Sequence, residues 1–403
     1  MWTSFSRAFQ KCDHNILLYK IRRLGIKGKL LRWIASFLRQ RKQRVLISGV
    51  VSEEADVTSG VPEGTVLGPL CFLIYVSDIG TGITSSMKIY IDDAKVTKPV
   101  RSEEDVEELQ GELDTLFSWA SSNNMKFNAK KFQVLRYGKN EELKNNTTYF
   151  TENMSEIVQR EETVRDLGVL LSDDGRFKKH LEKVVGTVRQ KTGWVLRTFQ
   201  SRSPFLMKTL YKTLIIPHLD YCSQLWSPIK KTEIQMLEKL QKDFFNRVPA
   251  LKNLSYWEKL EFLQMYSIER RLERYRIIYA WKILESRAPD CGIMVTHTEE
   301  SRLGRRCGPR QTIRRGGDRW AQTFQVQAPR LFNAIPKHVR NLTKCSTEDF
   351  KKSLDEYLSS VYDEPAFGGC VPRGIGEDGR ASNSVIHQMI KTGERGRMRR
   401  PGT

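Results

Sequence analysis

The chain has 403 residues, of which 39% are apolar and 10% aromatic, so it is long enough to build the cores of two or three globular domains. Its formal charge of +20 argues against an ordinary enzyme of small neutral metabolites and indicates a polyanionic partner, with nucleic acid as the first candidate and a membrane surface as the rival. The longest mostly apolar run, residues 66–76, is too short to span a bilayer and contains Gly68 and Pro69. We therefore expect no membrane partner.

The cysteines and the first residues indicate the compartment. Lys11 and Asp13 interrupt any apolar run that a secretory signal would need. The seven cysteines are scattered and form no C-x-x-C pair, which is typical of a reducing compartment. Cys291, His297 and Cys307 are conceivable zinc ligands, but their spacing matches no standard site. We expect an intracellular protein of the nucleus or cytoplasm that is not secreted.

The first part of the chain alternates helix and strand signals. Residues 13–25 predict a helix that begins after the cap-competent Asp13 and ends at Gly25. "KLLRWIASFLRQ" predicts a second helix, and "RVLIS" with a turn around Ser48 and Gly49 predicts a hairpin. A glycine-rich turn then leads into an apolar helix from about Gly68 to Ser77.

The stretch "KIYIDDAKV", residues 88–96, predicts two short strands with Asp92 and Asp93 at the bend between them. Aspartate is a good turn residue, and this alone would explain the pair. A hairpin with carboxylates at its tip is also how a protein presents oxygen ligands to Mg²⁺. The sequence pattern leaves both interpretations open.

Beyond the hairpin, helix signals dominate. Ser102 and Asp105 offer a capping box to a helix with one apolar face. After about residue 180 the strand signals nearly vanish, and amphipathic helices are expected at 185–199, at 206–214 before Pro217, and at 234–244. The expected class is therefore α+β at first and helical afterwards.

Residues 266–289 predict a further helix with Ile268, Leu272, Tyr275 and Tyr279 directed inward and a dense row of arginines directed outward. Such a row is usually a solvated face, and the high net charge adds nucleic-acid contact as a second interpretation. The candidate nucleic-acid-binding residues are Arg270, Arg271, Arg274 and Arg276.

Taken in order, these stretches resemble one family, the reverse transcriptases of non-LTR (LINE-type) retrotransposons, particularly the jockey-like and chicken-repeat-like groups. "SGVPEGTVLGPLCFLIYVSDI" resembles motif B, "YIDD" motif C and "MKFNAKK" the motif D region. "VRDLGVLLSDDGRFKKHL" resembles the stretch around motif E, and "LYKTLIIPHLDYCSQLWSP" resembles the thumb. The resemblance extends from about Phe5 to about residue 388, and the order of the motifs is its most specific part.

The resemblance implies an α+β partial right-hand polymerase palm, with an antiparallel sheet and helices, followed by an α-helical thumb and a helical, basic C-terminal extension. The regions expected on this basis are a partial palm with motifs A to E (1–180), a thumb-like region (181–250), an arginine-rich helical extension (251–300), a basic linker (301–320), a small helical segment (321–365) and a disordered basic tail (366–403).

The activity implied is RNA-directed DNA polymerisation on an RNA template with a DNA primer. Asp92 and Asp93 would be the catalytic and Mg²⁺-binding carboxylates, and Lys131 matches the motif D lysine that protonates the leaving pyrophosphate. Phe9 falls at the aromatic gate beside the nucleotide sugar. An exposed structural lysine and a core phenylalanine are the alternatives for Lys131 and Phe9.

Motif B would supply the remaining nucleotide-binding positions. Gly60, Pro62 and Gly64 would allow close approach of the backbone to nucleotide and template. Glu63 stands where the family has a glutamine, so it replaces an amide by a negative charge.

Motif A departs further from the family. "SFSRAFQKCDHNILL" aligns with a motif whose usual form is Asp-Phe-Ser-Lys-Ala-Phe-Asp, so Ser4 and Gln10 stand in place of the two aspartates. Asp13 is the nearest acid, but its cap position turns it away from the hairpin.

We therefore expect a catalytically impaired, truncated copy of an element, without its fingers and endonuclease. The alternatives are a non-catalytic nucleic-acid-binding remnant that uses its basic helical C-terminal region, and a chain that does not fold stably. The oligomeric state is left open.

Overall fold

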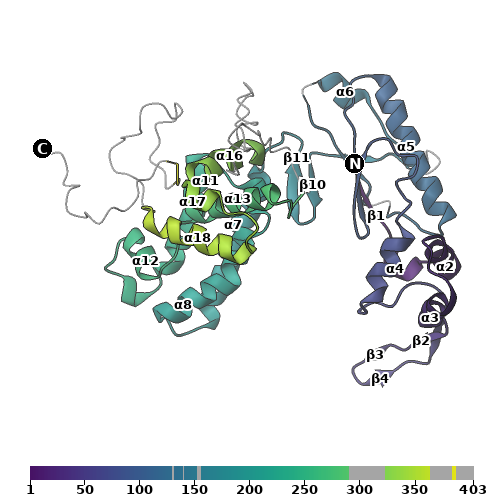
Figure 1. Cartoon of the computed structure of the whole chain (residues 1–403), viewed down its shortest axis with the longest axis horizontal. Coiled ribbons are helices and arrows are strands. Elements are labelled where there is room, and N and C mark those ends of the chain that lie inside the picture. Colours follow the sequence, from purple (N-terminus) through teal and green to yellow (C-terminus); the bar gives the residue numbers. More distant parts are fainter. Residues whose placement is uncertain (129–130, 139, 152–155, 290–322, 364–383, 387–403) are drawn as a thin grey trace, which may run out of the picture. The chain divides into compact units, whose positions relative to one another are not determined.

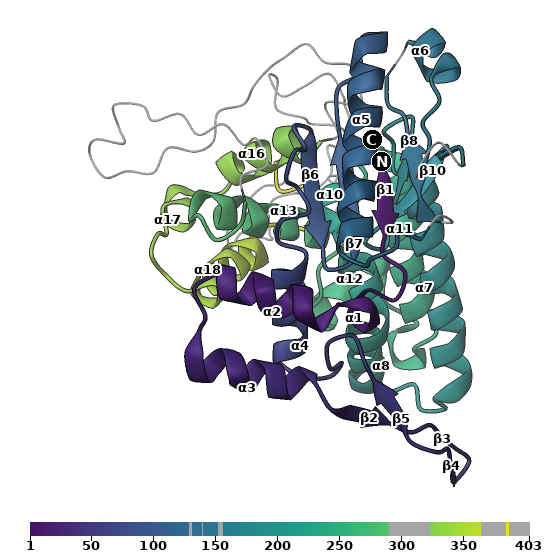
Figure 2. The same ribbon diagram turned by 90° about the vertical axis from the view of Figure 1, so that its right-hand side faces the viewer.

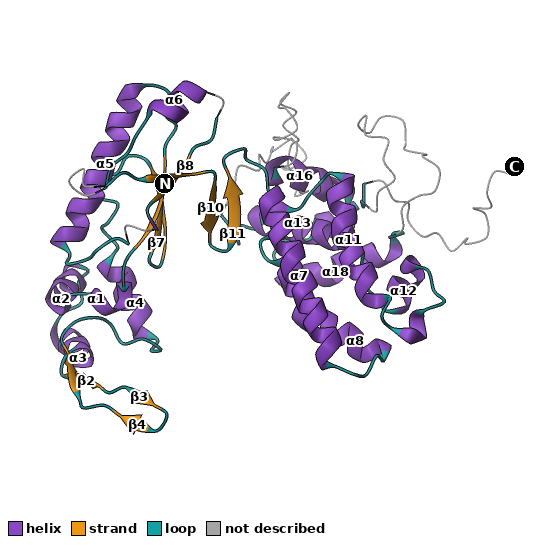
Figure 3. Cartoon of the chain, turned by 180° about the vertical axis from the view of Figure 1, so that it is seen from behind, coloured by secondary structure: helices purple, strands orange, loops and turns teal. Residues whose placement is uncertain are grey.

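The computed structural model describes residues 1–128, 131–138, 140–151, 156–289, 323–363 and 384–386. Contacts divide the chain into two compact units, Met1–Gly175 and Arg176–Thr403. The first unit combines helices with strands, whereas the described elements of the second are helices (Figures 1 and 3). The expected mixture of helices and antiparallel strands is therefore confirmed.

A five-stranded sheet organises the first unit, with the strand order β6–β7–β1–β8–β9 (Figure 2). The strands are β1 (Trp2–Ser4), β6 (Ser86–Tyr90), β7 (Asp93–Thr97), β8 (Gln133–Leu135) and β9 (Gln159–Glu161). β1 pairs antiparallel with β7 and β8, whereas β8 and β9 are parallel. The N-terminal strand is thus an inner strand between two segments that come much later in the sequence.

The first unit contains six helices in its described residues, and most of them share a buried core with one face of this sheet. The six helices are α1 (Ala8–Lys11), α2 (His14–Arg23), α3 (Gly28–Leu38), α4 (Leu67–Tyr75), α5 (Glu103–Ser122) and α6 (Glu141–Asn146). Phe5 and Val96 from the sheet share a buried core with Leu116 of α5. The expected capping box begins α5: Asp105 N donates to Ser102 Oγ at 3.4 Å, and Ser102 N donates to the Asp105 carboxylate at 3.2 Å.

A hairpin packs against Trp2 on the other face of the sheet. Its strands are β10 (Thr163–Asp166) and β11 (Val169–Ser172), and Val164 shares a small buried cluster with Trp2 and Leu135. Lys95 Nζ of β7 donates to an Asp166 carboxylate oxygen at 2.7 Å. Because neighbours in a strand point to opposite faces, Trp2 and Ser4 share this second face.

A separate ribbon follows α3. It consists of β2 (Arg41–Gln43) paired with β5 (Ala55–Val57), and β3 (Leu46–Ile47) paired with β4 (Val50–Val51). Ser48 and Gly49 form its turn at φ values of 49° and 85°, so the turn lies where the sequence predicts it.

The second unit is built around two cores. Its elements are α7 (Lys178–Thr198), α8 (Pro204–Leu210), η3 (Tyr211–Ile215), α9 (Ile216–Asp220), α10 (Ser223–Trp226), α11 (Lys231–Phe245), η4 (Pro249–Leu251), α12 (Tyr256–Phe262), α13 (Ile268–Leu284), α16 (Phe324–Ala334), α17 (Lys337–Arg340) and α18 (Thr347–Ser360). The first core joins α7 to α11 and the start of α13, for example through Val188, Phe244 and Leu272. The second joins the rest of α13 to α16 and α18, where Trp281 stacks on Phe350 at 4.5 Å.

Two expectations about element ends are wrong. Helical structure continues beyond Pro217, because this proline lies in the first turn of α9, where its missing N–H has no partner to lose. A π-helical turn, η3, connects α8 to α9. The expected boundary at residue 180 falls inside α7, where His180 and Leu181 are already buried in the helical core.

Some expectations concern residues outside the described ranges. The basic linker at 301–320 lies there, and so does most of the tail at 366–403. Within that tail, Val385 is described and buried, and its N–H donates to the Glu273 carboxylate at 2.8 Å. No helix among the described residues has the length and apolar character needed to cross a membrane.

Candidate active site

The register of the sheet brings the motif A and motif C segments together. Ser4 of β1 lies directly opposite Asp93 of β7, and Phe5 N donates to Asp92 O at 3.2 Å. On the other side of β1, Asn128 N donates to Ser4 O at 2.8 Å. A short inner strand therefore places Ser4 between the acidic hairpin and the segment that leads to Lys131.

The hairpin has a two-residue turn at Ile91 and Asp92, not at Asp92 and Asp93 as expected, because Asp93 is the first residue of β7 and pairs with Tyr90. Ile91 has φ 58°, a left-handed conformation that is strained for a β-branched residue. Such strain costs on the order of 1 to 3 kcal/mol and is concentrated at functional sites. The turn leaves Asp92 half-buried and Asp93 exposed at the start of β7.

Neighbouring charges shift the pKa of Asp93 in opposite directions. Partial desolvation raises the pKa of Asp93, and the neighbouring Asp92 carboxylate raises it further. The exposed Lys131 lowers the pKa of Asp93, whereas Asp166 raises it slightly. The two candidate carboxylates thus repel each other, and Lys131 is a cation close enough to act on one of them.

Ser4 is the weak member of this site. Its side chain is only 1% exposed, and its hydroxyl has no hydrogen-bond partner. Among the described residues, no group of three or more His, Cys, Asp or Glu side chains is arranged to hold a metal ion. A pair of Mg²⁺ ions requires charged oxygen ligands that outcompete water, and a neutral buried hydroxyl is a poor one. The residues present therefore do not fit the metal pair that the resemblance implies.

The motif B loop is pressed against motif A. Gly60 has φ +82°, and a Cβ there would lie 2.7 Å from the Gln10 Cα and 2.8 Å from the carbonyl oxygens of Phe9 and Gln10. Gly60 N also donates to Cys12 O at 2.8 Å. The described structure thus explains Gly60 by close approach of two backbones. Gly64, at φ +75°, has open space around it.

Sequence reasoning missed the role of Gly68. A Cβ on this residue would lie 2.3 Å from Pro62 O, so only glycine allows α4 to start so close to the motif B loop. The available signal was a glycine followed by Pro69 at the start of an apolar run, which marks an element boundary.

Phe9 has the contacts of a core aromatic. It is half-buried and stacks on Phe72 with ring centroids 4.7 Å apart and planes inclined by 18°. Its expected role as a gate beside the nucleotide sugar stays a prediction.

Two substituted positions meet across motifs A and B. Gln10 Nε2 donates to Glu63 Oε1 at 3.4 Å. In the family form that this sequence resembles, the first position is the acid and the second the amide. In this chain the amide is at position 10 and the acid at position 63, so an acid and an amide are still in contact. The sequence alone shows only two separate departures from the family pattern.

Asp13 is occupied as a helix cap, as expected. Its carboxylate accepts hydrogen bonds from Asn15 N at 2.8 Å and Ile16 N at 3.1 Å, and Asn124 Nδ2 donates to it at 3.3 Å. It is thus committed to the start of α2 rather than to the hairpin.

The expected solvated arginine row on α13 is wrong. Arg270 and Arg276 are buried, and Arg270 donates to Tyr362 O at 2.7 Å. Arg271 binds both oxygens of Asp220 at 2.8 and 2.6 Å, and Arg274 binds both oxygens of Asp355 at 2.5 and 2.6 Å. These arginines hold segments of the second unit together, so they are not available as a basic surface.

Comparison with known proteins bears on the first unit most directly. The sequence model of the family described as "Reverse transcriptase (RNA-dependent DNA polymerase)" matches residues 4–171, which include Ser4 at the end of β1, the motif B loop and the acidic hairpin. Residues 4–171 belong to the reverse transcriptase family.

Individual relatives identify the type of reverse transcriptase. The "RNA-directed DNA polymerase from mobile element jockey" of Drosophila melanogaster is 26% identical over 257 residues, covering 60% of this chain and 27% of that protein. The Drosophila funebris protein of the same name is 28% identical over 254 residues, with the same coverage. The "Probable RNA-directed DNA polymerase from transposon X-element" of Drosophila melanogaster is 25% identical over 310 residues, covering 72% of this chain and 34% of that protein. The reverse transcriptase domain is therefore of the non-LTR, LINE type, and the chain spans about a quarter to a third of the length of these relatives.

Proposed function

We propose that this chain binds template and primer as a reverse transcriptase does, but adds nucleotides poorly or not at all. One observation carries the proposal: the side chain opposite Asp93 in the inner strand is that of Ser4, a neutral residue, where a polymerase needs a second carboxylate. The parent activity is RNA-directed DNA polymerisation, and its setting would be intracellular.

In this proposal, the first unit contains the polymerase palm expected at 1–180, the helices from α7 to α11 form the thumb expected at 181–250, and α13 belongs to the extension expected at 251–300. The inner strand β1 beside the β6–β7 hairpin supports the first assignment. The helical core that follows it in sequence supports the second.

Each surviving residue has a defined task. In the parent activity, Asp92 and Asp93 would be carboxylates that hold Mg²⁺, whose charge stabilises the transferring phosphate, and this chain keeps them without the motif A carboxylate. Lys131 would protonate the leaving pyrophosphate from the side of Asp93. Phe9, Pro62 and Gly64 would contact the nucleotide.

Primer extension tests the catalytic part. The purified chain with Mg²⁺ or Mn²⁺, a primed RNA template and deoxynucleotides should show no extension above background. Removing a supporting residue of a metal site costs about 10 to 100-fold, so loss of a direct ligand should cost at least as much. Template-dependent extension that disappears in Asp92→Ala would overturn this part of the proposal.

The alternative function is nucleic-acid binding without catalysis through the basic C-terminal region. The arginines of α13 no longer support it, so it rests on the net charge and on the seven arginines of residues 301–320.

Truncation before Ser301 would remove α16 and α18, which complete a core with α13. The sharper experiment replaces the seven arginines by glutamine in the full chain and measures RNA binding over a range of salt. Log K should fall by roughly 0.7 to 0.9 per neutralised phosphate for each tenfold rise in salt, and the variant should show a shallower slope. An unchanged slope would contradict this alternative.

A further inference from the structure

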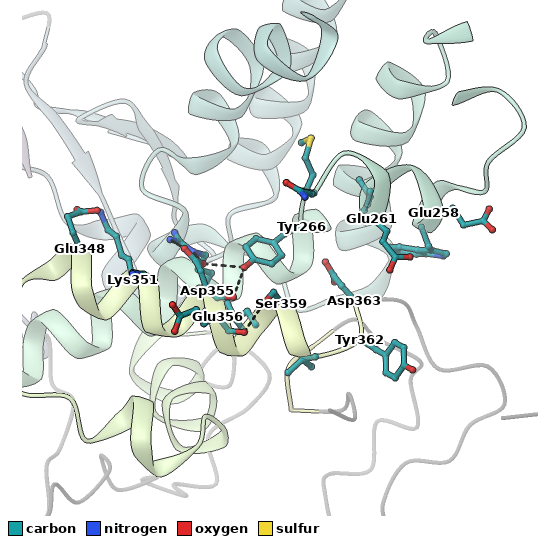
Figure 4. A pocket seen from close by; sticks show the side chains of 18 residues that line it. Glu258, Glu261, Tyr266, Glu348, Lys351, Asp355, Glu356, Ser359, Tyr362 and Asp363 are labelled. Carbon is teal, nitrogen blue, oxygen red and sulfur yellow. Dashed lines mark hydrogen bonds and ion pairs between the residues drawn. The ribbon is translucent and has the colours of Figure 1, made fainter. Parts of the chain in front are cut away.

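A groove in the second unit runs along α18, between this helix and α12 (Figure 4). Its volume is about 1210 Å³, which is above the roughly 300 to 1,000 Å³ typical of pockets for small molecules. Residues from α12, the loop that follows it, Arg274 of α13, the length of α18 and the three residues after it line the groove. A groove of this size and length suits a peptide segment better than a metabolite.

The floor of the groove is apolar. Leu260, Leu358 and Val361 are at most 3% exposed, and Met265 is half-buried beside them. Such a floor can bury the aliphatic stems of long side chains while their charged ends reach the rim.

The rim is acidic. Six carboxylate residues line the groove, against three basic ones. The rim carboxylates are those of Glu258, Glu261, Glu348, Asp355 and Glu356, which Figure 4 shows along α18 and α12. The sixth, Asp363, is enclosed and accepts hydrogen bonds from Ser267. Two of the basic residues are used internally, since Arg274 pairs with Asp355 at 2.5 Å and Lys351 with Glu348 at 2.7 Å.

This charge is opposite to that of the whole chain, which carries +20. A phosphate backbone would be repelled by such a rim, whereas a cationic segment would be attracted. The groove is therefore distinct in its chemistry from any surface of this chain that binds nucleic acid.

Three aromatic side chains complete the lining. Trp257, Tyr266 and Tyr362 lie along it, and aromatic faces attract guanidinium groups. Arginine combines this stacking with bidentate binding to carboxylates, which lysine cannot match. The lining therefore favours arginine among cationic side chains.

The walls are fixed in place before any ligand binds. Tyr266 donates to the Asp355 carboxylate at 3.3 Å, and Arg270 holds Tyr362 O at 2.7 Å. Ser255 and Ser346 begin α12 and α18 with complete capping boxes. A preformed groove loses little conformational freedom on binding.

We propose that this groove binds an arginine-rich peptide segment of a partner protein. The inference does not depend on the polymerase-like site, because the groove lies entirely within the second unit.

The test uses the full chain and a fluorescein-labelled oligo-arginine peptide, with binding followed by fluorescence anisotropy. Glu261 and Glu356 are exposed rim residues, so Glu261→Gln with Glu356→Gln should leave the fold intact. The matched control, Glu182→Gln with Asp243→Asn, removes the same charge from exposed positions of α7 and α11. We expect the rim variant to bind the peptide about tenfold more weakly and the control to bind within about twofold of the original chain.

Several outcomes would overturn the proposal. Equal weakening in the two variants would show attraction to net charge rather than to the groove, and absence of binding at low salt would exclude the site. An oligo-lysine peptide that binds as tightly would exclude arginine recognition. If replacing the seven arginines of residues 301–320 by glutamine strengthens peptide binding about tenfold, the occupant is this chain's own segment and not a partner.

Discussion

Ser4 occupies the inner-strand position whose side chain faces Asp93, so its identity decides how many carboxylates meet at the start of β7. A serine hydroxyl can be buried there without a partner at a modest cost, whereas a carboxylate would need a cation. In the proposed site, a serine at this position therefore takes the place of a metal ligand and also removes the need for the metal.

This gives a prediction for Ser4→Asp. Without divalent metal, a buried carboxylate at position 4 beside Asp93 should lower the free energy of unfolding by about 3 kcal/mol, because its charge is uncompensated. Mn²⁺ should then raise the melting temperature of this variant, but not that of the original chain. Thermal unfolding with EDTA and with Mn²⁺ measures both effects. Ser4→Asn is the neutral control of similar size. If the aspartate variant responds to Mn²⁺ no more than the asparagine variant, Ser4 does not face the metal position.

A second prediction concerns Gln10 and Glu63, whose side chains meet at 3.4 Å. Gln10→Asp alone would set two carboxylates against each other and should cost roughly 0.5 kcal/mol, the magnitude of an exposed charge pair. Adding Glu63→Gln should recover that loss, because it restores one amide and one acid. A double-mutant cycle by denaturant unfolding measures the coupling. Additive effects of the two changes would mean that the contact has no energetic role.

At the scale of elements, α13 shows where sequence patterns fail. Period-3.6 spacing correctly predicted this helix, and Ile268 and Leu272 are buried as expected. The same pattern assigned Arg270 and Arg276 to solvent because charged residues are rarely buried without partners. Their partners come from distant segments, such as Asp363 and the carbonyl of Ser227, and local periodicity carries no information about them. By contrast, the hairpin at Asp92 and the cap at Asp13 depend on neighbouring residues and were predictable.

The third prediction tests whether Arg270 stabilises the fold or contacts RNA. Arg270→Gln should lower the free energy of unfolding by about 3 kcal/mol, because it removes the cation beside the enclosed Asp363 carboxyl. It should leave RNA affinity per folded molecule nearly unchanged. Arg247→Gln, at an exposed position of the same unit, removes the same charge and should leave stability within about 0.5 kcal/mol. Denaturant unfolding measures the stability of both variants, and a binding titration measures their affinity for RNA. If Arg270→Gln keeps its stability but binds RNA more weakly, and Arg247→Gln does not, then Arg270 contacts RNA.

At the scale of the whole molecule, half-buried and buried acids make stability depend on pH. Burial raises the pKa of Glu238 to about 8 and that of Glu273 to about 7, and burial also raises the pKa of Asp363. All three lie in the second unit, around α13. Glu238 and Glu273 therefore each hold a proton in the folded chain at pH values where the unfolded chain has released it.

The last prediction follows from the sign of these shifts. Below the ordinary glutamate pKa of 4.5, folded and unfolded chains both hold the Glu238 proton, and its contribution to stability is fully present. Between this value and about 8, only the folded chain holds the proton, so stability falls as pH rises, by up to about 1.4 kcal/mol per pH unit for one group. Glu238→Gln removes this proton, and its amide can still accept the hydrogen bond from Glu269 N that the carboxylate accepts at 2.9 Å. The variant should therefore lose less stability than the original chain between about pH 5 and pH 8, as measured by denaturant unfolding at several pH values. Parallel pH profiles for the two proteins would show that Glu238 is already ionised in the folded chain, and that the enclosure of its carboxyl by Tyr256 and Glu269 does not control its charge.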